Sequence, residues 1–235
     1  MSFFNPSPVE ARLTLRVLAH LLRYPDATSR AHGPELIDAI DREGALSPTR
    51  ILELIALIHR LCNRAAMEVE SAYVDIFDRG RRTSLLLFEH VHGDSRDRGP
   101  AMVDLIQTYE KAGLFLDPDE LPDYLPVVLE FASTQPAVQA REFLGEIVHI
   151  IRAIFTALVE RESDYASVLA AVIELAGEKA EPVAIREEQE LDESWAEPEV
   201  FGGCSTEGQA KPGQPQPIRI IKRSATEVQL NQSGV

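Results

Sequence analysis

Two histidines and two aspartates lie within eight residues of one another, at His90, His92, Asp94 and Asp97. Imidazole and carboxylate groups are ligands for zinc and iron. Side chains two positions apart on a helix point in different directions, however, and no cysteine stands at ligand spacing nearby. A hydrogen-bonded, partly exposed histidine pair therefore fits the pattern better than a metal site. We predict that the protein binds no metal here.

The chain offers no constellation that would support catalysis. It contains no glycine-rich phosphate loop, no nucleophile elbow and no cysteine–histidine pair in a suitable context. Carboxylates are abundant, but they fall on helix faces or in the tail, where solvated surface is the usual reading. We predict that the protein is not an enzyme.

The charged stretch from Asp94 to Arg98 allows two interpretations. It is either a solvated loop with internal arginine–aspartate pairs, each worth about 0 to 1 kcal/mol, or a surface that meets a basic peptide. In the second reading Arg96 and Arg98 hold Asp94, Asp97 and Glu89 in position.

The elements that carry these residues are predicted to be helices. Apolar residues recur at steps of three and four, and no hairpin dipeptide separates alternating runs. Residues 47–80 fit either one long helix or two nearly continuous ones. The other predicted helices span residues 8–23, 34–42, 85–90, 100–112, 127–133, 137–161 and 165–176. The fold class is therefore all-α, a single bundle of about eight helices in residues 1–177.

Residues 178–235 are predicted to form a flexible tail. Between Glu178 and Glu199, nine acidic residues face two basic ones, which gives about −7, and apolar side chains are few. The rest is rich in glycine and proline. Trp195 and Phe201 stand out in this segment. Three hypotheses remain open for these aromatic residues: they dock back onto the helical body, they contact a partner, or they are chance aromatics in a disordered tail.

The net charge and the number of cysteines restrict which partners and which cellular compartment can be expected. The 23 basic and 38 acidic residues give 23 − 38 = −15, which disfavours nucleic acid and anionic membrane surfaces. This charge serves either solubility alone or the binding of a cationic ligand. Only Cys62 and Cys204 are present, so no disulfide framework is expected. Because no apolar run approaches a membrane span, we predict a cytoplasmic protein without direct membrane insertion.

The run from Phe77 to Gly99 closely resembles the redox enzyme maturation chaperones, and most closely the molybdenum cofactor assembly chaperone, or delta subunit, of respiratory nitrate reductase. The likeness continues through Ala101–Leu105, Tyr109–Leu114 and Glu120–Asp123, and covers most of residues 8–175. One departure is Tyr124, where the wider family tends to have histidine.

This resemblance implies a chaperone that binds the apo catalytic (alpha) subunit of nitrate reductase through an N-terminal leader-like helix. The chaperone would keep that subunit competent for cofactor insertion before membrane attachment. It would hold no cofactor permanently, since molybdenum-bis(guanine dinucleotide) is delivered to the client, and molybdenum cofactor biosynthesis proteins are further candidate partners. A general helical adaptor for another basic amphipathic peptide is the alternative.

The client helix is predicted to lie in an apolar groove with an acidic rim. The residues assigned to this surface are Tyr73, Phe77, Arg79, Arg82, Leu85, Phe88, Glu89, His90, His92, Asp94, Arg96, Asp97, Arg98, Met102, Tyr109, Glu120, Pro122, Asp123 and Tyr124. Pro122 and Pro126 form either a simple proline loop or a hinge, a region that the wider family connects with nucleotide binding.

Overall fold

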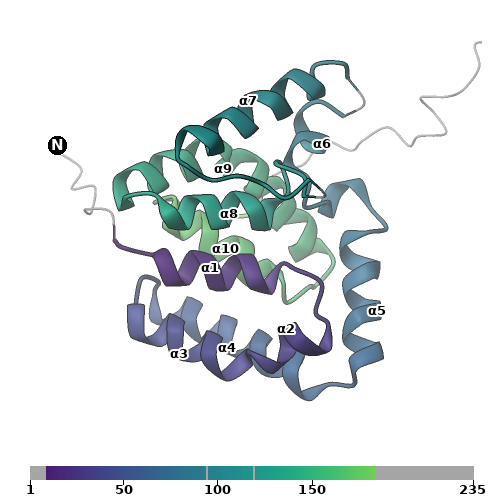
Figure 1. Ribbon diagram of the computed structural model, residues 1–235. Helices are drawn as coiled ribbons and strands as arrows, with labels where there is room; N and C mark the ends of the chain where they lie inside the picture. Colours follow the sequence, from purple (N-terminus) through teal and green to yellow (C-terminus); the bar gives the residue numbers. More distant parts are fainter. Residues whose placement is uncertain (1–8, 94, 119, 184–235) are drawn as a thin grey trace, which may run out of the picture. The chain divides into compact units, whose positions relative to one another are not determined.

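The computed structural model describes residues 9–93, 95–118 and 120–183, and all the regular elements in these ranges are helices (Figure 1). They are α1 Arg12–Leu21, α2 Ala27–Ala31, α3 Gly33–Glu43, α4 Pro48–Asn63, α5 Ala66–Phe77, the 3₁₀ helix η1 Arg81–Thr83, α6 Leu87–Val91, α7 Arg98–Lys111, α8 Leu125–Thr134, α9 Ala137–Glu160 and α10 Ala166–Leu175. The all-α prediction is confirmed. Eight of these helices have ten residues or more, which matches the expected number, and α2 and α6 are single short turns.

The start of α1 departs from the prediction for a physical reason. The sequence favoured a start at Pro8, whereas the helix begins at Arg12. A carboxylate from another helix supplies the cap, because Glu43 at the end of α3 accepts hydrogen bonds from the backbone N–H groups of Leu13 (3.0 Å) and Thr14 (2.6 Å). Such groups have no partner within the helix itself, so α3 fixes where α1 starts.

Replacing Glu43 by alanine should therefore destabilise the protein by about 1–2 kcal/mol, because two first-turn N–H groups lose their anionic acceptor. The Glu43→Gln variant keeps one side-chain oxygen and should lose less. Urea unfolding followed by circular dichroism measures both. Equal stability of the alanine variant and the parent would show that the contact contributes nothing.

The long apolar pattern of residues 47–80 resolves into two helices. The chain leaves the helical conformation at Arg64 and Ala65, where both residues are extended, and α5 then runs across the direction of α4 (Figure 1). Ser47 precedes Pro48 at the start of α4, as predicted. The turn at Arg64 allows α5 to connect the α3–α4 layer with η1 and α6.

The core is centred on α1, which lies between α8 on one side and the α3–α4 pair on the other, with α10 behind it (Figure 1). Its apolar face is buried at Leu15 and Leu18, and Leu22 directly after the helix is fully buried. α9 packs along α10 and presents Leu144, Ile151 and Leu158 to the same core. At about 25 cal/mol per Å² of apolar surface removed from water, this shared core is the main source of stability.

Residues 178–183 lie against α9, although the tail was predicted to start at Glu178. Glu178 is ion-paired with Arg152, and the backbone N–H of Val183 donates to the Thr156 hydroxyl at 3.1 Å. Cys204, Trp195 and Phe201 lie outside the described residues, as does the rest of the predicted tail. In the ranges that the structure describes, no helix combines the length and apolar character that a membrane span requires.

Candidate functional site

The two halves of the predicted site are joined by backbone hydrogen bonds. Leu86 and Tyr124 form an isolated antiparallel bridge. On either side of it, the N–H of Leu125 donates to the carbonyl of Leu85 at 2.8 Å, and the N–H of Leu87 donates to the carbonyl of Asp123 at 3.0 Å. The segment before α6 and the loop before α8 therefore form one unit, which we call the clasp (residues 84–88 and 120–125).

Asp123 is the buried polar residue of the clasp. Its side chain is fully buried, and Oδ2 accepts a hydrogen bond from the Phe88 N–H at 3.1 Å. Oδ1 has no hydrogen-bond partner among the described residues. Burial raises the pKa of this carboxyl, against the opposing effects of the Phe88 N–H and of Arg98, whose Nη2 lies 3.8 Å from Oδ2. Asp123, whose carboxyl group is hard to ionise, thus holds the start of α6 against the loop before α8.

Three tyrosine hydroxyls bind backbone carbonyls around the clasp. Tyr109 donates to the carbonyl of Pro122 at 2.8 Å, and Tyr73 donates to the carbonyl of Leu22 at 2.7 Å. Tyr124 reaches the same Leu22 carbonyl at 3.4 Å. Burial raises the pKa of all three phenols, so they stay protonated and serve as hydrogen-bond donors. Tyr124 thus links the loop to the end of α1.

Several residues that were assigned to a client groove are buried in the protein interior. Tyr73 and Phe77 form an aromatic cluster with Tyr165, with Phe77 centred 4.8 Å from Tyr73 and 5.0 Å from Tyr165. The others in this group are Leu85, Tyr109, Pro122 and Asp123. In this conformation these side chains support the surface from beneath, and a peptide on that surface would not touch them.

The remaining predicted residues lie at the surface. Phe88, Glu89, His90, His92, Arg98, Met102, Glu120 and Tyr124 are half-buried, whereas Arg79, Arg82, Arg96 and Asp97 are exposed. Asp94 lies outside the described residues. The half-buried group gathers on α6, on the first half of α7 and on the loop before α8, and exposed Leu121 adjoins it. This is the part of the predicted site that a partner can reach.

Ion pairs bind most of the predicted arginines to neighbouring helices. Arg79, two residues beyond the end of α5, pairs with Asp75 of that helix, and Arg82 pairs with Glu160 at the end of α9. Arg98 lies 3.8 Å from Glu89, which supports the predicted arrangement of these two residues. Exposed pairs of this kind contribute about 0–1 kcal/mol each, so the acidic partners stay available to a cationic ligand.

The two histidines have separate environments. Nε2 of His90 lies 2.9 Å from the carbonyl of Ser84, while the His92 ring packs edge-on against Phe88 at a centroid distance of 5.6 Å. Within the described ranges, no group of three or more histidine, cysteine, aspartate or glutamate side chains is placed to hold a metal ion.

Arg161 ends one of the predicted helices, and in the structure it has a positioning role that the sequence did not indicate. Its guanidinium donates to the carbonyls of Asp75 (2.7 Å) and Ile76 (3.2 Å) and to the Thr83 hydroxyl (3.3 Å). It therefore joins the end of α5 to η1 just before the clasp. No local signal could have indicated this, because the partners lie 78 to 86 residues away in sequence.

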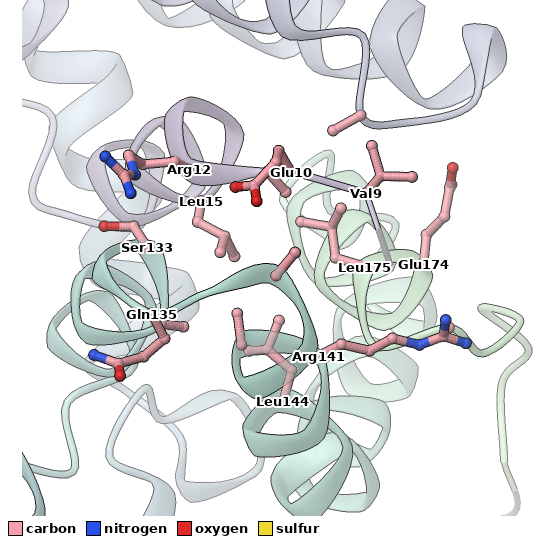
Figure 2. A pocket seen from close by; sticks show the side chains of 16 residues that line it. Val9, Glu10, Arg12, Leu15, Ser133, Gln135, Arg141, Leu144, Glu174 and Leu175 are labelled. Carbon is pink, nitrogen blue, oxygen red and sulfur yellow. The ribbon is translucent and has the colours of Figure 1, made fainter. Parts of the chain in front are cut away.

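Several hollows in the described part of the chain lie away from the clasp. One of about 110 Å³ opens between the start of α1, the end of α8, the start of α9 and the end of α10. Leu15, Leu144 and Leu175 line it, and the charged ends of Arg12 and Glu174 point away from its middle (Figure 2). Another, of about 220 Å³, lies between α4, α5 and the turn before α10. Neither contains a residue assigned to the site from sequence.

Sequence comparison identifies the family. The family model described as nitrate reductase delta subunit matches residues 45–171, more than half of the chain. The chain belongs to the nitrate reductase delta subunit family. The predicted membership is confirmed, and the family is one of chaperones, not of enzymes.

Individual members of the delta subunit family match over most of their length. The nitrate reductase molybdenum cofactor assembly chaperone NarJ of Escherichia coli K12 is 38% identical over 198 residues, covering 80% of this chain and 84% of that protein. A probable chaperone of the same description from Bacillus subtilis 168 is 32% identical over 163 residues, covering 68% and 86%. The span that the family model matches contains the clasp, α4 to α9 and most of α10. It does not contain α1, α2 or α3.

Proposed function

We propose that the protein is an assembly chaperone that binds the catalytic subunit of a respiratory nitrate reductase before the molybdenum cofactor is inserted. The observation that carries this proposal is the 38% identity to the E. coli assembly chaperone across four fifths of the chain. The cofactor, molybdenum-bis(guanine dinucleotide), is delivered to the client and is not held by the chaperone. The chaperone acts in the cytoplasm, before the client attaches to the membrane, and cofactor biosynthesis proteins are its further partners.

The exposed part of the predicted site is the proposed client surface. It combines the apolar side chains of half-buried Phe88 and exposed Leu121 with the carboxylates of Glu89 and Glu120. An amphipathic leader helix carrying arginine or lysine has the complementary apolar and cationic faces. The net charge of −15 adds attraction at longer range.

The expected affinity follows from the area that such a helix covers. Burial of about 500 Å² of apolar surface at about 25 cal/mol per Å² gives roughly 12 kcal/mol before costs. Loss of rigid-body freedom and ordering of the peptide offset most of this. A dissociation constant between about 1 nM and 1 μM is therefore expected.

Isothermal titration calorimetry with a peptide from the N-terminus of the catalytic subunit tests the proposal. Glu89→Gln and Glu120→Gln should each weaken binding and reduce its dependence on salt, because each removes an acidic contact for the peptide. Asp41→Asn is the matched control, since Asp41 is an exposed carboxylate on the distant α3. Binding that does not distinguish this peptide from arbitrary basic amphipathic helices would favour the general adaptor instead.

A further inference from the structure

α7 is joined to the rest of the helical body by few side chains. Of its 14 residues only Tyr109 is buried, whereas α8, α9 and α10 bury eight, ten and six residues. Met102, Leu105 and Ile106 on the same face of α7 are only half-buried. Because local stability follows buried apolar contact, α7 should open at a lower free energy than the core helices.

The surface beneath α7 is a small apolar cluster separate from the main core. Tyr109 packs on Phe131 of α8 at a centroid distance of 4.7 Å, and Phe131 packs on Phe143 of α9 at 5.0 Å. Val127 completes the buried part of the cluster. Removal of α7 would thus uncover Val127 and Phe131, and no residue of α7 belongs to the buried part of the main core.

The polar attachments of α7 reach two adjacent residues of the clasp and Glu89 of α6. The Tyr109 hydroxyl donates to the Pro122 carbonyl, and Arg98 approaches the Asp123 carboxylate. The segments on either side of the helix contain Gly93 (φ 52°) and Gly113 (φ 79°). Glycine adopts this left-handed backbone without steric cost, and these two positions can take up a change of direction at both ends of α7.

We propose that α7 occupies a helix-binding surface formed by Val127, Phe131 and Phe143, and that an amphipathic helix of a partner displaces it. The present occupant shows what the surface fits, because its apolar side chains recur at helical spacing from Met102 through Leu105 and Ile106 to Tyr109. A tethered helix has a high effective concentration, so a partner at low concentration replaces it only by burying more apolar surface, whereas an equivalent helix must be added in large excess. The identity of that partner as the nitrate reductase leader rests on the proposed function.

Hydrogen exchange followed by mass spectrometry tests the opening in the free protein. Backbone amides of residues 98–111 should exchange much faster than those of α9. Tyr109→Phe removes only the hydrogen bond to Pro122 and should speed exchange in α7 by roughly fivefold to tenfold, with α9 unchanged. Tyr24→Phe is the control, because this hydroxyl bonds Glu70 at the surface. Exchange in α7 as slow as in α9 would overturn the proposal.

A second set of exchange measurements tests displacement. Saturation with the catalytic-subunit peptide should remove the protection of residues 98–111 from hydrogen exchange. If the peptide binds while this protection stays unchanged or increases, the proposal is overturned. A synthetic peptide of residues 98–111, added in excess, should also speed exchange of the protein's own α7. This probe does not depend on the client, so it separates failure of the displacement model from failure of the proposed function. No effect of this peptide would count against a helix-binding surface.

Discussion

Replacing Phe77 by alanine lowers the free energy of unfolding by about 3–5 kcal/mol, the range for deleting a buried aromatic ring. The side chain is 6% exposed and packs against both Tyr73 and Tyr165. The cavity cannot close easily, because these two rings also pack against each other at a centroid distance of 6.0 Å. Urea unfolding monitored by circular dichroism measures the loss.

The Phe88→Ala variant separates stability from client binding. Phe88 has the same side chain but is half-buried on the exposed side of the clasp. Its removal should therefore cost much less stability, while it should lower the affinity for the leader peptide. Phe77→Ala should bind peptide normally in proportion to its folded fraction. A destabilisation of Phe77→Ala below about 1 kcal/mol would contradict the burial argument. Folded Phe77→Ala protein that has lost peptide affinity would instead place Phe77 in the client contact.

Asp123→Ala should lower the free energy of unfolding by about 1–3 kcal/mol at pH about 4, because the part-buried Phe88 N–H loses its acceptor. Asp123→Asn keeps an oxygen for that N–H and should match the parent under the same conditions. Urea unfolding of the three proteins measures the difference. An alanine variant as stable as the asparagine variant would show that the hydrogen bond is dispensable.

The pH dependence of the Asp123→Asn variant has a defined sign. Burial places the pKa of Asp123 in the folded protein above that in the unfolded chain, so the folded state binds the proton more strongly. The parent has its full stability from this group below the unfolded pKa, and loses stability as the pH rises towards the folded pKa. The asparagine variant has no such loss, so its advantage over the parent should grow from pH about 4 upwards and then level off. An advantage that shrinks with rising pH would show that Arg98 outweighs burial.

Helix positions followed well from apolar periodicity and from local start signals. Ser47-Pro48 and Pro136 mark the starts of α4 and α9, and Gly44 ends α3 in the left-handed conformation. The start of α1 was wrong because its cap is Glu43, about 30 residues away. The short α2 was missed, although Asp26 caps it by accepting a hydrogen bond from the Ser29 N–H. Local patterns therefore predict helices whose ends are set locally.

The candidate site was predictable as a region but not in its geometry. The motifs of residues 77–99 and 120–123 do meet in space, through the hydrogen bond from the Leu87 N–H to the Asp123 carbonyl beside the bridge of Leu86 and Tyr124. Periodicity cannot say which apolar residues face the core and which face a partner. Tyr73, Phe77 and Tyr109 were therefore assigned to an open groove, although they are buried. The contacts of Arg161 were also hidden, since they depend on tertiary structure alone.

The central position of α1 has a consequence for synthesis on the ribosome. This helix is made early, but it packs on α8 and α10, which are made last. Over a hundred residues separate the end of α1 from the end of α8, which at ordinary elongation rates is a wait of roughly ten seconds. During that interval α3 is the main helix available to cover the apolar face of α1. Nascent chains that end before Leu125 should remain protease-sensitive, and the body should become resistant only when α8 to α10 have emerged.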